Sequence, residues 1–472
     1  MISSISALFA RGRGPVRLAA AAVASGLVAV GVLATAGTAA AAEVTQSQGG
    51  ATATIGGLKT YGAALVHAKS GDQEVSAGLF EMSVEGGGTL QTYSVDLYNP
   101  TQRDAKYHET PWSGTLLAAN RNAGRIRWIL QNSYPQVNDL ASLADKAGIG
   151  AGLTEQDAAA GTQVAVWRYS DGAAVDAVDP QAERLADYLQ KAARVVAEPT
   201  ASLTLDVPAV AGRPGGLLGP VTVHTGATSA TVTPPLDAAT SGVRIVGKDG
   251  RPLTAVSDGS QLFFDVPADT AAGSAELTVQ ASTTVPVGRA FTSDSRSQTQ
   301  ILAGSSESTV SATASATWAQ KGAIPALSAA KNCSKAGVDI AAANQGDEAF
   351  TFELMGVQHT IPAGGSRTVT VPLQEDQAYD FSIVGPRGDQ SRFTGVLDCR
   401  TQADEIAGLT TQTLSEPSPA TVGGVSAADD TDLAATGGSS ATPLIAGTAI
   451  GLVVIGGAAL VLVGRKENGS QG

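Results

Sequence analysis

Two kinds of hydrophobic periodicity occur in the first 200 residues of the chain. Residues Glu74–Ser83 and Thr89–Tyr98 alternate apolar and polar side chains, with three consecutive glycines between them. A period of two predicts β-strands, and the glycines predict the turn that joins them. Three later segments have helical spacing instead: Asn122–Tyr134, Thr154–Tyr169 and Pro180–Val196. We therefore expect one α+β domain over residues 43–200.

Local signals mark the ends of these helices. Pro135 follows the first helix, and a proline cannot continue a helix without losing a hydrogen bond. Thr154 and Asp157 have the spacing of a capping box at the start of the second helix, with Asp in place of the usual Glu. Gly172 is placed to end that helix. The second helix is therefore predicted from signals at both of its ends.

Helical spacing disappears between residues 201 and 320. Short alternating segments recur there, separated by Gly, Pro and Asp. Strands of this length and spacing are typical of an immunoglobulin-like β-sandwich. The predicted strands are Ser202–Val207, Val221–His224, Ala230–Val232, Gly242–Val246, Leu262–Val266, Ala275–Ala281 and Ser308–Thr317.

A smaller β-domain is predicted over residues 321–400. Cys333 and Cys399 are the only cysteines of the chain, and they lie just outside its first and last strands. An isolated pair in an exported chain favours a disulfide, which would join the two ends of this domain. The expected strands are Gly337–Ala343, Ala349–Leu354, Ser366–Val371, Tyr379–Val384 and Gln390–Leu397.

The C-terminal part has the pattern of a stalk and a membrane anchor. Residues 401–432 are rich in Ser, Thr, Ala and acidic residues, which is typical of a flexible segment. The uncharged stretch 441–464 is long enough to cross a bilayer core of about 30 Å as a helix. Arg465 and Lys466 follow it and predict that the tail stays in the cytoplasm. We therefore expect a multi-domain chain with a C-terminal transmembrane helix.

The N-terminal residues have the pattern of a signal peptide. Arg11, Arg13 and Arg17 precede the apolar stretch Leu18–Val32. The three alanines at 40–42 offer a small-residue cleavage site. Residues 1–42 are therefore predicted to direct export, which places the body of the chain outside the cell.

Charge excludes several classes of partner and chemistry. Five of the 30 basic residues and one of the 43 acidic residues lie in the two terminal segments, so the exported part has a net charge of −17. Such a surface repels phosphate, and we expect no nucleic-acid partner. The histidines are scattered, and no Cys/His spacing resembles a zinc site, so no metal and no cofactor are expected. No nucleophile with a base partner stands out, which argues against an enzyme.

Three ordered motifs resemble those of the bacterial thioester domain family, found in surface adhesins, over residues 55–197. The motifs are Tyr93-Ser94-Val95-Asp96-Leu97, Tyr107-His108-Glu109-Thr110-Pro111-Trp112 and Thr162-Gln163-Val164-Ala165-Val166-Trp167. In that family a strand cysteine and the helix glutamine condense into an internal thioester, which a target amine then opens. By resemblance, Gln163 is the glutamine of this site.

The chain departs from the family at the other residue of the site. Ser94 stands where the family has cysteine, and no cysteine precedes Cys333. Three interpretations remain: a degenerate site in which Ser94 and Gln163 are merely hydrogen-bonded, an internal Ser–Gln ester, or a noncovalent ligand cleft. The polar residues expected near such a cleft are Asp96, Tyr107, Glu109 and Asp171.

The segment before the predicted anchor resembles the cell-wall sorting signal of Gram-positive surface proteins. It reads Leu433-Ala434-Ala435-Thr436-Gly437, with Ala434 in place of the family's proline. The resemblance implies that a sortase binds the chain transiently and transfers it through Thr436 to peptidoglycan; an uncleaved chain would remain a single-pass membrane protein. We therefore expect a protein anchored at the cell surface for adhesion or display, with an unidentified ligand. The alternative is a structural envelope protein with no foreign ligand.

Overall fold

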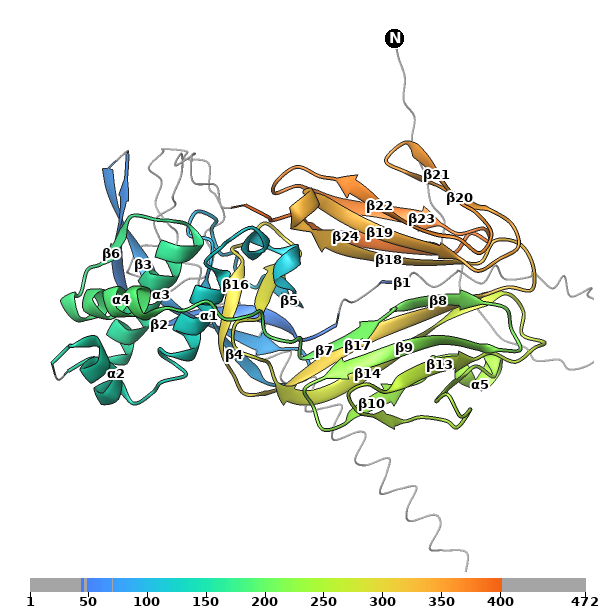
Figure 1. Cartoon of the computed structure of the whole chain (residues 1–472), viewed down its shortest axis with the longest axis horizontal. Coiled ribbons are helices and arrows are strands. Elements are labelled where there is room, and N and C mark those ends of the chain that lie inside the picture. Colours follow the sequence, from blue (N-terminus) through green and yellow to red (C-terminus); the bar gives the residue numbers. More distant parts are fainter. Residues whose placement is uncertain (1–43, 46–48, 70, 151, 401–472) are drawn as a thin grey trace, which may run out of the picture.

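The computed structural model describes residues 44–45, 49–69, 71–150 and 152–400. These residues form three regions, which Figure 1 shows as a helix-containing lobe beside two stacked β-layers. We call them the helical region (residues 49–200 and 285–306), the sandwich (201–284 and 307–322) and the C-terminal β-region (323–400). The predicted signal peptide, stalk, sorting signal and membrane helix lie outside the described residues. Among the described residues, no helix has the length and apolar character needed to cross a membrane.

Six strands of the helical region pair in a closed ring. Their order is β3-β4-β16-β15-β5-β2, and β2 also pairs with β3, so every strand of the ring has two neighbours. A short seventh strand, β6, extends the sheet from β2. The bounds are β2 (Thr52–Ala68), β3 (Gly71–Val84), β4 (Thr89–Ser94), β5 (Lys106–Thr110), β6 (Val175–Ala177), β15 (Ala290–Ser293) and β16 (Gln300–Ser305).

Strands β15 and β16 differ from the sequence-based division of the chain. They lie within residues 201–320, which we expected to belong to the sandwich, yet they fill the gap between β4 and β5. Gln300 pairs with Ser94 on one side of this hairpin, and Thr292 pairs with His108 on the other. Without the hairpin, β4 and β5 would each leave a row of backbone groups unpaired. The sandwich is therefore inserted between the first strands of the ring and its last two.

The helices cover the ring and the long β2–β3 hairpin. Helix α3 contacts β2, β3, α1 and α4, and residues Ala158–Trp167 of α3 are all buried. The predicted capping box is confirmed: Thr154 Oγ1 accepts from the amide of Asp157, whose carboxylate accepts from the amide of Thr154. The helices are α1 (Ala123–Gln131), α2 (Leu140–Ala147), α3 (Glu155–Ser170) and α4 (Pro180–Ala192); α2 was not predicted.

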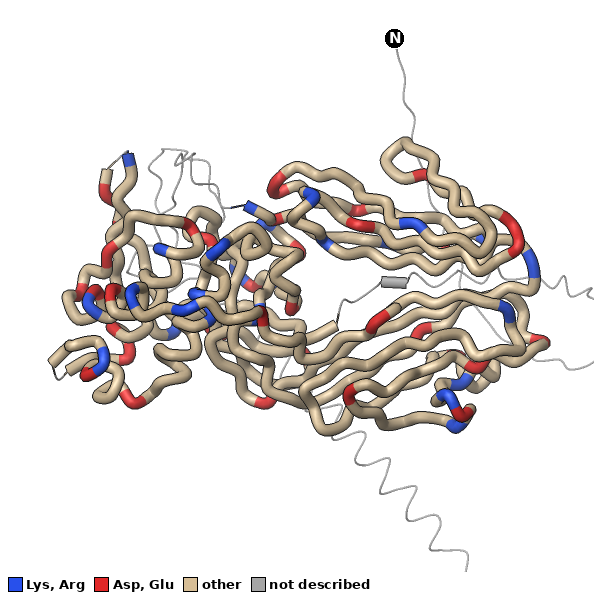
Figure 2. Tube along the Cα trace, viewed as in Figure 1, with Lys and Arg blue, Asp and Glu red and all other residues tan. Residues whose placement is uncertain are grey.

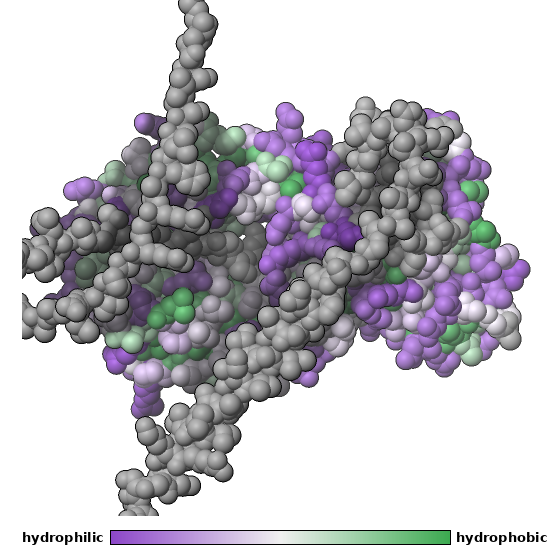
Figure 3. Space-filling model, turned by 180° about the vertical axis from the view of Figure 1, so that it is seen from behind, coloured by the Kyte–Doolittle hydropathy of each residue, from purple (hydrophilic) through white to green (hydrophobic). Residues whose placement is uncertain are grey.

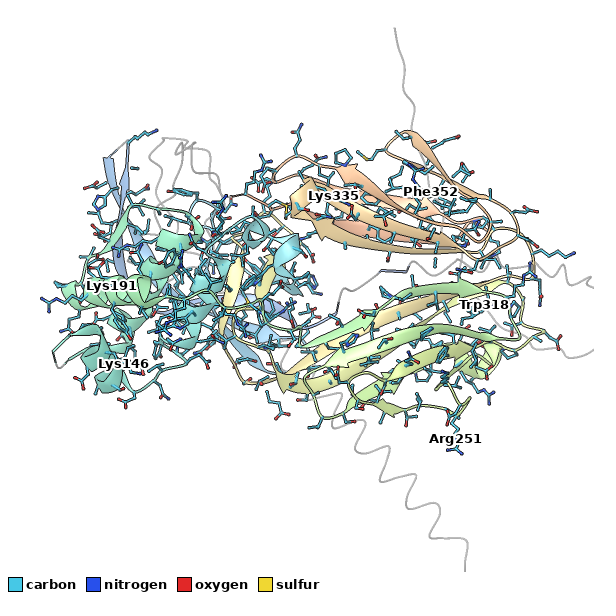
Figure 4. The ribbon with its side chains drawn as sticks, viewed as in Figure 1. Lys146, Lys191, Arg251, Trp318, Lys335 and Phe352 are labelled. Carbon is cyan, nitrogen blue, oxygen red and sulfur yellow. A yellow bond between two sulfur atoms is a disulfide. The ribbon has the colours of Figure 1, made fainter. Side chains whose placement is uncertain are left out.

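The sandwich consists of two sheets whose apolar side chains join those of the ring. Its sheets have the orders β12-β10-β14-β17-β8 and β11-β13-β9-β7. One hydrophobic cluster runs from Met82 and Leu302 of the ring to Val310 and Trp318 of β17. Figure 4 labels Trp318 at the far end of this layer, where its indole N–H donates to Ala271 O at 2.8 Å. The sandwich and the ring therefore share a core. The bounds are β7 (Leu203–Asp206), β8 (Ala209–Gly212), β9 (Leu217–Thr225), β10 (Ala230–Thr233), α5 (Ala238–Ser241), β11 (Arg244–Val246), β12 (Ala255–Val256), β13 (Gln261–Asp265), β14 (Gly273–Thr284) and β17 (Glu307–Trp318).

The C-terminal β-region has its own hydrophobic core and a disulfide. Cys333 and Cys399 are bonded, with their Cα atoms 5.2 Å apart. The disulfide, which was predicted, joins a short helical turn before β19 to the residues that follow β24. Strand β18 was not predicted and precedes Cys333, so the bond does not join the two ends of the region as expected. Phe350, Phe352 and Phe393 are buried in the core of this region, and Figure 4 labels Phe352. The strands are β1 (Val44–Thr45), β18 (Pro325–Asn332), β19 (Gly337–Asn344), β20 (Phe350–Leu354), β21 (Val357–Ile361), β22 (Ser366–Pro372), β23 (Ala378–Val384) and β24 (Gln390–Val396).

Candidate functional site

Ser94 and Gln163 meet inside the helical region. Ser94 is the last residue of β4, and Gln163 lies in the middle of α3. The side-chain amide of Gln163 donates to Ser94 O at 2.8 Å, and its Oε1 accepts from Ser94 N at 3.0 Å. Both residues have an exposed fraction of 0%. The structure thus places the two predicted residues in contact and shields both from solvent.

The hydroxyl of Ser94 belongs to a tight turn that ends β4. Ser94 Oγ lies 3.1 Å from both Asp96 O and Asp96 N, donating to the first and accepting from the second. On the next residue, Leu97 N donates to Asp171 Oδ1 at 3.1 Å, which ties this turn to the end of α3. The turn therefore brings Asp96 and Asp171 close to Ser94, as expected from the sequence.

Asp96 and Asp171 lie where a negative charge is poorly solvated. Burial raises the pKa of Asp96 well above its ordinary value, and the charges of Asp398 and Asp171 raise it further. Asn99 Nδ2 donates to Asp96 Oδ2 at 2.5 Å, whereas Asp96 Oδ1 has no hydrogen-bond partner within the described residues. Burial also raises the pKa of Asp171 to about 7. Both carboxyl groups therefore hold a proton more readily than an exposed aspartate does.

A third carboxylate reaches this turn from the C-terminal β-region. Thr299 O accepts from Val95 N at 3.1 Å, and Thr299 Oγ1 donates to Asp398 Oδ2 at 2.6 Å. Burial raises the pKa of Asp398 to about 6, and the charges of Glu375 and Asp376 raise it further. Asp398 and Thr299 were not predicted as site residues. No local signal marks them, because each reaches the site only through the packing of two regions.

Two other predicted site residues, Glu109 and Tyr107, form their hydrogen bonds away from Ser94 and Gln163. Glu109 is buried in the joint between the ring and the sandwich, where Oε1 accepts from Arg289 Nε at 2.8 Å and Ser202 N at 2.9 Å. Its Oε2 accepts from Ala51 N at 3.1 Å. Tyr107 donates its hydroxyl to Gln298 O at 2.8 Å and so holds the loop between β15 and β16. Among the described residues, neither forms a hydrogen bond with Ser94 or Gln163; the hydrogen bonds of both hold neighbouring segments together.

A separate cavity of about 370 Å³ lies where the three regions meet. Its lining includes His108, Asp294, Lys331 and Tyr379, but neither Ser94 nor Gln163. His108 Nε2 and Asp294 Oδ2 lie 2.9 Å apart at its edge, and Lys331 Nζ donates to Thr292 Oγ1 at 3.2 Å. A ligand held in this cavity would therefore contact polar residues of several strands without reaching the Ser94–Gln163 pair.

The described surface is mixed in character. Acidic residues are spread over all three regions, with basic residues between them (Figure 2). On the face shown in Figure 3, hydrophilic and hydrophobic side chains are interspersed over the described part of the chain. Within the described residues, acidic positions are therefore found in each of the three regions.

Comparison with known proteins identifies the domain that holds this site. Residues 91–195 match the sequence model of the thioester domain family, and this segment includes both Ser94 and Gln163. Residues 91–195 of the helical region therefore resemble a thioester domain, a type of domain that typically occurs in surface adhesins. No curated protein sequence matches the chain.

Three solved structures resemble the chain at low identity. The Bacillus anthracis TIE protein is 15% identical, with a TM-score of 0.26 over 74% of this chain and 63% of that one. The thioester domain of the Enterococcus faecium TIE86 protein is 16% identical, with a TM-score of 0.26 over 59% of this chain and 98% of that one. The E. coli chaperone DraB is 14% identical, with a TM-score of 0.17 over 42% of this chain and 97% of that one. This chain thus spans less than two thirds of the B. anthracis protein.

Proposed function

We propose that this chain is a non-enzymatic bacterial surface protein whose thioester-like domain acts in adhesion or display without acylating its target. The observation that supports this is the buried contact of Ser94 with Gln163 inside a segment that matches the thioester domain family. An ester at this position would be a poor acylating agent, because an alkoxide leaves far less readily than a thiolate. Binding would then rest on shape, hydrogen bonds and charge.

We also propose how the chain is exported and anchored at the cell surface. Residues 1–42 would direct export, and Leu433–Gly437 would be recognised by a sortase that joins Thr436 to peptidoglycan. The immunoglobulin-like sandwich, the C-terminal β-region and the stalk would then hold the helical region away from the wall. Without cleavage, the helix at 441–464 would anchor the same chain in the membrane.

Reaction with a small amine tests the central claim. The full-length chain is incubated with methylamine, and the peptide containing Gln163 is analysed by mass spectrometry. We expect no adduct, because no thioester is present to be opened. An adduct on Gln163 of the unaltered chain would overturn the proposal.

The substitution Ser94→Cys is the informative variant. Because the glutamine amide already lies against residue 94, we expect the new cysteine to condense with Gln163, with loss of about 17 Da as ammonia and a gain of methylamine reactivity. The double variant Ser94→Cys/Gln163→Ala is the matched control and should show neither change. A Ser94→Cys chain that folds but keeps its full mass would show that more than the sulfur atom has been lost.

An internal Ser–Gln ester is a second candidate, favoured by the same contact. In that reaction Ser94 Oγ would bond to the side-chain carbonyl carbon of Gln163, the C–N bond would break, and ammonia would leave with the hydroxyl proton. The backbone of Asp96 exchanges hydrogen bonds with Ser94 Oγ, and the raised pKa of its carboxyl group makes Asp96 the candidate proton donor and acceptor for this reaction. A mass deficit of about 17 Da in the unaltered chain, abolished by Ser94→Ala, would identify this ester; a full mass would exclude it.

A further inference from the structure

Three carboxylates of the C-terminal β-region gather at its contact with the helical region. Glu375, Asp376 and Asp398 each offer a carboxylate oxygen, and these three oxygens lie within 4.8 Å of one another. A calcium ion binds carboxylate oxygens at about 2.3–2.6 Å, so two ligands of one ion are at most about 5 Å apart. The spacing of the three oxygens is therefore that of ligands around a single ion.

An orphaned buried oxygen independently indicates a missing partner at this place. Asp398 is 8% exposed, and its Oδ1 has no hydrogen-bond partner among the described residues. Its other oxygen is fixed by Thr299 Oγ1 at 2.6 Å, so the carboxylate cannot turn away to reach solvent. A buried carboxylate oxygen without a donor or a cation is costly.

The same place contains a small cavity. Asp376 and Asp398 line a space of about 10 Å³, together with Asn99 and Ser297 of the helical region. This is about the volume that one water molecule or one small ion requires. Apart from Val396 the lining residues are polar, and they come from both regions, so an occupant of this space would contact the helical region and the C-terminal β-region together. Glu375 does not line this space and would reach the ion from beside it.

Three basic residues lie near these carboxylates. Arg296 lines the cavity, and its Nε donates to the backbone oxygen of Asp376 at 2.9 Å. Lys331 donates to Thr292 Oγ1 at 3.2 Å, and its charge acts on Asp398. The charge of Arg400 likewise acts on Glu375, whose carboxylate accepts from the backbone N of Arg400 at 2.8 Å.

We propose that Glu375, Asp376 and Asp398 bind one calcium ion at the contact between the C-terminal β-region and the helical region. Waters would complete the six to eight oxygen ligands that calcium takes. The ion would offset the negative charge that Asp398 and Asp376 exert on Asp96, which lies two residues beyond Ser94. No sequence motif announces this site, because Glu375 and Asp398 converge only through the pairing of β23 with β24.

Titration calorimetry of the full-length chain, freed of metal with EGTA, tests this site. We expect CaCl₂ to bind with one ion per chain and a Kd on the order of 10⁻⁴–10⁻³ M, with MgCl₂ binding more weakly. Calcium should also raise the melting temperature. Absence of both the binding heat and the melting shift at about ten times that concentration would overturn the proposal.

Two amide substitutions locate the ion. Asp398→Asn retains an oxygen that can accept from Thr299, and Glu375→Gln retains one for Cys399 N, so both variants should fold. Each should weaken calcium binding by about tenfold or more. Glu353→Gln, at an exposed carboxylate of β20, is the matched control and should leave the affinity unchanged. Calcium binding that survives both site substitutions would place the ion elsewhere and reject this assignment.

Discussion

Two joints of this molecule bury carboxylates, and the chain neutralises only one of them. In the joint between the ring and the sandwich, Glu109 has an ion pair with Arg289 and hydrogen bonds from Ser202 and Ala51. In the joint between the helical region and the C-terminal β-region, one oxygen of Asp96 and one of Asp398 lack any partner among the described residues. The first joint is complete in itself. In the second joint, neutralisation of the buried carboxylates depends on protons or a cation from the solution.

The difference teaches how similar carboxylates acquire opposite roles. A buried charge with a fixed partner stabilises its surroundings at any pH where both groups are charged, and removing one partner leaves the other unpaired. A buried carboxylate without a partner instead gains a raised pKa and responds to pH. We therefore expect the same chemical change, carboxylate to amide, to have opposite effects at the two joints.

The largest effect is expected for Glu109→Gln. This change leaves Arg289, which is 4% exposed, without its main carboxylate, although Glu198 remains at 3.1 Å. We expect a loss of about 3 kcal/mol in the free energy of unfolding, measured by urea denaturation. Glu85→Gln, which removes an exposed ion pair with Lys106, is the control and should cost less than about 1 kcal/mol. Equal effects of the two substitutions would show that the buried pair is not a stabilising joint.

A smaller effect of opposite sign is expected for Asp96→Asn. At pH 8, in calcium-free buffer, the variant should be more stable than the unaltered chain by about 1 kcal/mol, because its folding has neither to bury a charge nor to bind a proton at position 96. At pH 4 the difference should vanish, since the folded chain then holds Asp96 protonated at little cost. Destabilisation by Asp96→Asn at pH 8 would contradict the contrast between the two joints.

The last effect to be measured is the titration of Asp171, which appears as a slope of stability against pH. Its pKa is about 7 in the folded chain and near 3.8 in an ordinary environment, so between these values the folded chain holds more protons than the unfolded chain. The stability contributed by this group is therefore fully present below about pH 4 and is lost as the pH rises towards 7. Denaturation midpoints measured in half-unit pH steps should show this slope, and Asp171→Asn should flatten it. An unchanged slope in the variant would assign the pH dependence to other groups.

Much of the local structure could be predicted from the sequence. The helix with the Thr154 capping box, most strands of the sandwich and the pairing of Ser94 with Gln163 follow from periodicity, capping signals and the ordered motifs. These features depend on side chains that are near in sequence or that a family motif already relates. For example, the alternating segment Ser308–Thr317 lies in β17, which pairs with β14 along its whole length.

The sequence did not show which sheet each strand joins. Residues 290–305 have the pattern of ordinary strands, and nothing in that pattern says that they join the ring and not the sandwich. The choice is made by the unpaired edges of β4 and β5, which accept Gln300 and Thr292 as partners. The domain boundary that we expected at residue 200 is therefore the point at which the inserted sandwich begins.

By itself the sequence determined the types of element and the pair Ser94 and Gln163, in which serine stands where the related family has cysteine. It also determined that Cys333 and Cys399 are the one pair able to form an intramolecular disulfide. Only the tertiary structure decided that the sandwich is inserted into the ring, that Glu109 has Arg289 as its partner, and that Asp398 lies beside the turn after Ser94. The physical reason is that periodicity reports which face of an element is buried, whereas the partner of that face, and the charge it brings, are fixed only when distant segments pack together.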